Sequence, residues 1–151
     1  MSIRVLLSDD HRIVREGLRT LLDKEPDIEV VGEAEDGRST LELARKLKPQ
    51  VVIMDITMPD LNGMDATRKI IEELPDVKVL ALSMHADQQF VEGMLKAGAI
   101  GYLPKDCASE ELVRAVHTVA SNETYLSLRI ADVVRRDYLR QAKKVDTPGL
   151  P

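Results

Sequence analysis

Five short apolar segments alternate with amphipathic helical patterns along the chain, and this alternation restricts the fold more than any other feature. The segments are rich in Val, Ile and Leu, and three of them are nearly continuous, which is typical of strands buried on both faces. They span residues 3–8, 28–34, 51–55, 77–83 and 100–103. Strand and helix in regular succession predict a parallel sheet covered by helices on both faces.

The length of the chain narrows the choice among α/β folds. A closed eight-fold barrel needs about 250 residues, whereas this chain has 151. We therefore expect one doubly wound, flavodoxin-like α/β domain with five parallel strands in the order 2-1-3-4-5. Its crossover connections should be right-handed.

The C-terminal part of the sequence has a different character. After residue 125 the pattern predicts no sixth strand but a sixth helix to about residue 143, followed by a turn-rich tail. Residues 127–151 carry six basic and three acidic side chains, so this segment is +3 and leaves −8 for residues 1–126. We divide the chain into a domain at residues 1–124 and a linker helix with its tail at residues 125–151. We do not expect this chain to bind DNA directly, because DNA phosphates must be neutralised by positive charge and residues 1–126 are strongly acidic.

Composition also bears on the cellular setting. A single cysteine, Cys107, excludes an internal disulfide framework and a cysteine-rich zinc site. The apolar runs are far shorter than the roughly 20 residues that cross a bilayer, and the N-terminus shows no secretory signal. We expect a cytoplasmic protein with no membrane partner.

Polar side chains follow the predicted strands at the points where those strands end. They are Asp9 and Asp10 after the first strand, Asp55 at the end of the third, Ser83 at the end of the fourth, and Lys105 after the fifth. Open α/β sheets bind ligands outside the carboxyl ends of their strands, at the switch point in strand order. The pattern therefore predicts three carboxylates, a hydroxyl and an ammonium around one crevice.

Such a group of side chains points to a particular chemistry. Converging carboxylates repel one another and are costly to bury, and a hard cation relieves that repulsion. Mg²⁺ prefers oxygen ligands and combines one or two carboxylates with phosphate oxygens. A carboxylate beside Mg²⁺ and a lysine suits phosphoryl transfer, and the carboxylate can itself become an aspartyl phosphate.

Four motifs carry these residues at specific spacings. There are 45 residues from Asp10 to Asp55, 28 more to Ser83 and 22 more to Lys105. The motifs are Ser8-Asp9-Asp10-His11, Met54-Asp55-Ile56-Thr57-Met58-Pro59 with Gly63, Leu82-Ser83, and Gly101-Tyr102-Leu103-Pro104-Lys105. Over about residues 3–121 they resemble the receiver domain of bacterial two-component response regulators. The Asp-Asp-His and Gly-Tyr-Leu-Pro-Lys details and the following helix resemble the NarL/LuxR-type subfamily.

The resemblance implies roles for the acidic residues and the lysine. Asp55 would be the phosphoacceptor, served by a sensor histidine kinase. Mg²⁺ would be held by Asp10, by Asp9 through water, by Asp55 and by the backbone carbonyl of Thr57. Lys105 would contact the phosphoryl group.

The resemblance also implies a switch and an output. Ser83 would be the switch hydroxyl and Tyr102 the aromatic that changes rotamer with it, while Thr57 and His85 would tune the lifetime of the acyl phosphate. Phosphorylation would favour a homodimer, and DNA would be bound only through a helix-turn-helix domain that this sequence lacks. The chain is therefore interpreted as part of a transcription factor or as a single-domain receiver acting through protein contacts.

Other functions fit the same predicted fold less well. A phosphohydrolase using an aspartyl phosphate usually needs a second acid two residues after the nucleophile, where this chain has Thr57. A flavin protein would need a phosphate-binding loop after the first strand, where Asp9 and Asp10 would repel phosphate. A metal-independent interaction module stays open as a further alternative. We expect a phospho-switch and not a turnover enzyme.

Overall fold

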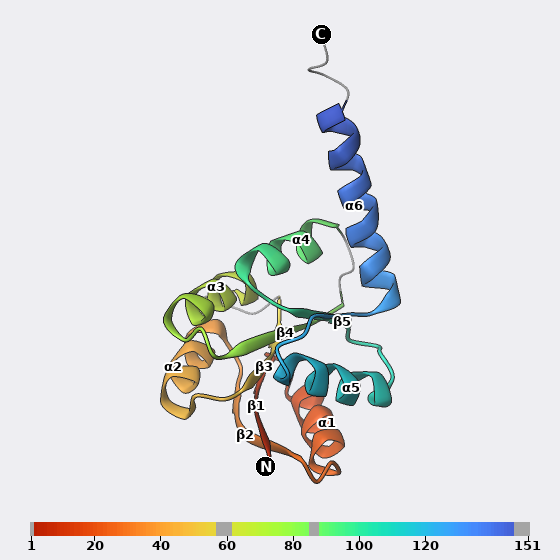
Figure 1. Ribbon diagram of the computed structural model, residues 1–151. Coiled ribbons are helices and arrows are strands. Elements are labelled where there is room, and N and C mark those ends of the chain that lie inside the picture. The colour runs from red at the N-terminus through yellow and green to blue at the C-terminus, as the bar shows by residue number, and fades with distance from the viewer. Residues whose placement is uncertain (1, 57–61, 85–87, 147–151) are drawn as a thin grey trace.

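The computed structural model describes residues 2–56, 62–84 and 88–146 and has a six-stranded parallel sheet in the order β2-β1-β3-β4-β5-β6 (Figure 1). The strands are β1 (Ile3–Ser8), β2 (Ile28–Ala34), β3 (Val51–Asp55), β4 (Lys78–Ser83), β5 (Gly101–Pro104) and β6 (Tyr125–Leu126). The helices are α1 (Arg12–Asp23), α2 (Gly37–Leu47), α3 (Gly63–Glu73), α4 (Gln88–Ala97), α5 (Ser109–Ala120) and α6 (Leu128–Asp146). The α/β class and the order of the first five strands confirm the sequence prediction.

Helices cover both faces of the sheet, as Figure 1 shows. Alternate strand residues enter two separate cores, because side chains of a strand point to opposite faces in turn. Leu6 packs with residues of α2, α3, α4 and α6, whereas Val5 and Leu7 pack with residues of α1 and α5. The central strand β3 is buried at every residue, which explains its continuous apolar sequence before Asp55.

The sheet has one strand more than predicted. β6 pairs with β5 in parallel through Gly101 opposite Tyr125 and Tyr102 opposite Leu126. The Tyr125 N–H donates to the Ile100 carbonyl at 2.9 Å, which joins the new strand to the sheet edge. The prediction that no strand follows residue 125 was wrong, because two residues are too few to produce a periodic pattern and their conformation depends on pairing with β5.

Helix α6 begins within the domain and then leaves it. Ile130, in its first turn, has no exposed surface, and Val133 and Val134 pack against the same core as residues of α4. The later turns of α6 project away from the sheet (Figure 1). Among the described residues, no helix combines the length and apolar character that would allow it to cross a bilayer. The division of the chain at residues 124 and 125 stays a prediction.

Helix α3 starts directly against the end of β3, and Gly63 makes this close approach possible. A Cβ at Gly63 would lie 2.7 Å from the Ile56 Cα, a distance that leaves no room for a side chain. The Gly63 N–H donates to the Ile56 carbonyl at 2.8 Å, and Asn62 caps the helix by accepting from the Asp65 N–H at 2.9 Å. This contact holds Ile56, the residue directly after Asp55, against the start of α3.

Candidate functional site

The acidic residues, the serine and the lysine of the predicted site gather at the carboxyl edge of the sheet. Asp9 follows β1, Asp55 ends β3 and Ser83 ends β4, and each has at most 2% of its surface exposed. Lys105 follows β5 and reaches back over this edge with only 9% of its side chain exposed. The parallel strands place these side chains together because all of them end at the same edge.

Lys105 joins the two buried carboxylates. Its Nζ lies 2.9 Å from Asp9 Oδ2 and 3.3 Å from Asp55 Oδ2. Its main-chain N–H donates to the Ser83 carbonyl at 2.8 Å, which ties the lysine to the end of β4. Burial alone would lower the pKa of Lys105, but the hydrogen bond to Asp9 and the charges of Asp55 and Asp9 outweigh it and raise that pKa above its ordinary value. The site therefore holds a fixed positive charge at neutral pH.

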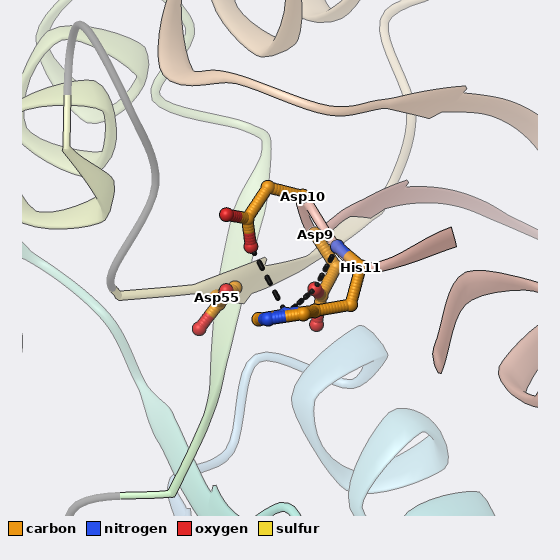
Figure 2. Close-up of side chains that lie close together, drawn as sticks. All are labelled: Asp9, Asp10, His11 and Asp55. Atoms are coloured by element: carbon orange, nitrogen blue, oxygen red, sulfur yellow. Dashed lines mark hydrogen bonds and ion pairs between the residues drawn. The ribbon is translucent and has the colours of Figure 1, made fainter. Parts of the chain in front are cut away.

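Four side chains at this edge offer ligand atoms within 4.8 Å of one another, namely Asp9, Asp10, His11 and Asp55 (Figure 2). Three carboxylates against one ammonium leave the cluster with an excess of negative charge. Oxygen donors of this kind are the ligands that Mg²⁺ prefers, so the residues present fit the predicted ion. The expectation that the acidic pair and Asp55 converge agrees with this geometry.

His11 belongs to this cluster, although the sequence analysis included it only in a motif and gave it no role at the site. Its Nδ1 lies 3.0 Å from Asp9 Oδ1 and 3.1 Å from Asp10 Oδ1, as the dashed lines in Figure 2 show. Its main-chain N–H also donates to Asp9 Oδ1 at 2.8 Å. The one signal in the sequence was its place directly after the acidic pair. Arg15 was missed as well, and it donates from Nη1 to the Asp9 carbonyl at 2.6 Å.

The remaining predicted site residues differ in their placement. The Ser83 backbone is held in the sheet opposite Pro104, next to Lys105. Tyr102 is fully buried, and its side chain belongs to the core that also contains residues of α4 and α6. Thr57 and His85 lie outside the described residues.

Comparisons with known proteins agree on one family. Residues 5–117 match the response regulator receiver domain. The transcriptional regulatory protein DegU of Brevibacillus brevis is 43% identical over 138 residues, which cover 91% of this chain and 58% of DegU. The chain spans about three fifths of the length of the curated relatives that it matches.

Solved structures show the same likeness. The crystal structure of a LuxR-family two-component response regulator from Aurantimonas sp. SI85-9A1 is 34% identical with a TM-score of 0.87, and the match covers 92% of this chain and 99% of that one. A structure of two RcsB dimers bound to two parallel DNAs is 25% identical with a TM-score of 0.81, and its match covers 89% of this chain and 69% of that one.

Proposed function

The chain belongs to the family of receiver domains found in two-component response regulators, and we propose that its Asp55 accepts a phosphoryl group from a sensor histidine kinase. The observation that carries this proposal is the Lys105 ammonium, which lies between the carboxylates of Asp9 and Asp55 in one buried acidic cluster. An ammonium in that place can neutralise charge on a group attached to Asp55. Catalysis of phosphoryl transfer consists largely of such positioning and charge neutralisation.

The proposed transfer has a simple balance. A carboxylate oxygen of Asp55 forms a bond to phosphorus while the phosphorus–nitrogen bond of the kinase phosphohistidine breaks. The imidazole leaves with the electron pair and takes up a proton. The product is an acyl phosphate on Asp55, and Lys105 is the side chain of this cluster that can pair with its new oxygens.

We further propose that Asp9, Asp10, Asp55 and the backbone carbonyl of Thr57 hold Mg²⁺, with Asp9 acting through water. The all-oxygen donor set of the three carboxylates supports this ion. When bound, Mg²⁺ would stabilise negative charge on the phosphoryl oxygens. The part assigned to Thr57 rests on the family resemblance.

The switch is proposed to be a shift between two populations, biased by contacts that form only in one state. Ser83 would turn toward the phosphoryl group and Tyr102 would change rotamer, while Thr57 and His85 would set the lifetime of the acyl phosphate. Tyr102 shares its core with residues of α4 and α6. A change at Tyr102 would therefore have to alter the packing of these two helices, since protein cores are close-packed.

For the whole protein, the proposed output is control of transcription through dimerisation on phosphorylation, in the cytoplasm. DNA would be bound by a helix-turn-helix domain outside this sequence. The relatives that are transcriptional regulators and the RcsB dimers on DNA support this proposal. A stand-alone receiver that acts through protein contacts is the alternative.

The phosphoacceptor can be tested with acetyl phosphate and Mg²⁺. Wild-type protein should gain the mass of one phosphoryl group, and Asp55→Asn should gain none, because the amide oxygen is a poor nucleophile. Asp76→Asn, at an exposed aspartate just before β4, is the matched control and should react as wild type does. Equal labelling of Asp55→Asn would reject the assignment, and multiple turnover of a phosphomonoester would indicate a phosphohydrolase instead.

A further inference from the structure

We propose that Arg15 is a positioning residue for the metal-binding acidic cluster, because it joins the Asp9 main chain to the end of β2. Arg15 lies in the first turn of α1, and among the described residues its side chain bonds to the Asp9 carbonyl and to Glu33, not to the carboxylates of the cluster. Its action is therefore indirect, through the backbone of a ligand. The inference rests on the proposed function, since it concerns the residues proposed to hold Mg²⁺.

The arginine makes two hydrogen bonds to different parts of the fold. Nη1 donates to the Asp9 carbonyl at 2.6 Å, and Nε donates to Glu33 Oε1, in β2, at 3.2 Å. Only 13% of the Arg15 side chain is exposed, so it is held in one place by its surroundings. We call the chain of contacts from Glu33 through Arg15 to the Asp9 carbonyl the Arg15 bridge.

The Asp9 carbonyl needs a partner that the secondary structure does not provide. Helix α1 begins at Arg12, and the Arg15 N–H donates to the His11 carbonyl, so the Asp9 carbonyl lies ahead of the helical hydrogen bonds. The Asp9 N–H, by contrast, donates to the Ala34 carbonyl at 3.0 Å. Buried peptide groups are nearly always hydrogen-bonded. The end of β2 thus holds both polar groups of the Asp9 main chain, one directly and one through Arg15.

This arrangement fixes the peptide that joins the two acidic residues. The Asp9 carbonyl belongs to the peptide group that leads into Asp10, so the Arg15 bridge restrains the rotation of that peptide. The Asp9 side chain is held separately, by Lys105 at Oδ2 and by the His11 N–H at Oδ1. Loss of the bridge would leave Asp9 paired but would remove a restraint on the main chain that positions Asp10, whose carboxylate would keep its contact with His11 Nδ1.

Glu33 holds the far end of the bridge and also binds a second arginine. Arg19 Nη1 lies 2.5 Å from Glu33 Oε2, while Arg15 Nε binds Oε1 of the same carboxylate. Burial would raise the pKa of Glu33, but its hydrogen bonds with Arg19 and Arg15 lower it, so this carboxylate stays ionised at neutral pH. Arg19 therefore offers a matched control, an arginine on the same carboxylate for which the structure gives no hydrogen bond to Asp9.

The expected effect is a loss of metal affinity. Groups that orient metal ligands typically change affinity by 10–100-fold when they are removed. Because Arg15 acts through one backbone carbonyl, we expect Arg15→Ala to raise the Mg²⁺ Kd about tenfold, and Arg19→Ala to change it by less than about twofold. Arg15→Lys keeps the positive charge but cannot make both hydrogen bonds of the guanidinium. We therefore expect it to show most of the rise in Mg²⁺ Kd that Arg15→Ala shows.

The test uses the full chain labelled with ¹⁵N and follows amide chemical shifts during Mg²⁺ titration. Spectra without Mg²⁺ establish that each variant is folded. If Arg15→Ala does not fold, the Mg²⁺ affinity of Arg15→Lys is compared with that of wild type instead. As a second measurement, the rate of phosphorylation by acetyl phosphate is recorded against Mg²⁺ concentration. Arg15→Ala should need more Mg²⁺ for half of its maximal rate, while its maximal rate stays near that of wild type.

The possible outcomes separate this inference from the proposed function. Equal weakening by Arg15→Ala and Arg19→Ala would overturn the inference, because Glu33 or net charge would then explain the effect. Wild-type affinity in Arg15→Lys would overturn it too, since charge alone would suffice. Unchanged Mg²⁺ binding by Asp10→Asn, or no binding by wild type, would overturn the proposed metal site and the positioning role together.

Discussion

Lys105 is the side chain whose removal should disturb this protein most directly. Without its ammonium, the buried carboxylates of Asp9 and Asp55 face each other with no cation between them. We expect Lys105→Ala to lower the free energy of unfolding by about 2–3 kcal/mol in the presence of EDTA, since breaking a buried ion pair leaves uncompensated charge. Because the pKa of Lys105 is raised, its contribution is complete at neutral pH and is lost only as the pH rises above its ordinary value of 10.5 toward the folded-state pKa.

Urea unfolding at pH 7 measures this effect. Lys96→Ala is the control, because Lys96 is 74% exposed and pairs with Glu92 on the surface of α4, where such a pair contributes at most about 1 kcal/mol. Similar unfolding midpoints for the two variants would show that Lys105 does not compensate the acidic cluster.

The first turn of α6 is expected to be an integral part of the folded domain. Ile130 is fully buried in the core that contains Tyr102, whereas Leu128, two residues earlier, is 90% exposed. Ile130→Ala should therefore cost about 2–4 kcal/mol through lost burial and the cavity left behind, and Leu128→Ala should stay within about 0.5 kcal/mol.

Thermal or urea unfolding of the two variants compares them at one concentration and pH. This result bears on the predicted division at residues 124 and 125. A stability loss confined to Ile130→Ala would mean that the folded unit continues past residue 124 into α6. Equal, small effects would favour a linker that does not contribute to the domain.

For the molecule as a whole, Mg²⁺ should act as a stabilising ligand. The ion would relieve repulsion among three carboxylates that the folded state brings within 4.8 Å and the unfolded state does not. At ten times its Kd, Mg²⁺ should add about 1.4 kcal/mol to the free energy of unfolding and raise Tm by roughly 3–6 °C. Calorimetry with and without EDTA measures the shift. Asp10→Asn should reduce it strongly, and a full shift in that variant would contradict the proposed ion site.

Much of the fold and of the site could be predicted from local patterns. Apolar periodicity marks buried strands, and five such strands alternating with helices have few parallel arrangements of this length. Parallel strands end at one edge, so residues that follow them in sequence meet in space. That geometry placed Asp9, Asp55 and Lys105 together before their distances were known, and the distances agree.

Contacts that cross between elements depended on the assembled structure. β6 has two residues and exists by pairing with β5, so its own sequence carries no pattern. The Arg15 bridge depends on the register of β1 and β2, which shifts between Val5 and Leu6 and sets Ser8 opposite Ala34. Local periodicity reports which face of an element is buried, but it contains no information on such an offset. The offset is a property of the paired strands β1 and β2, and that pairing exists only in the folded chain.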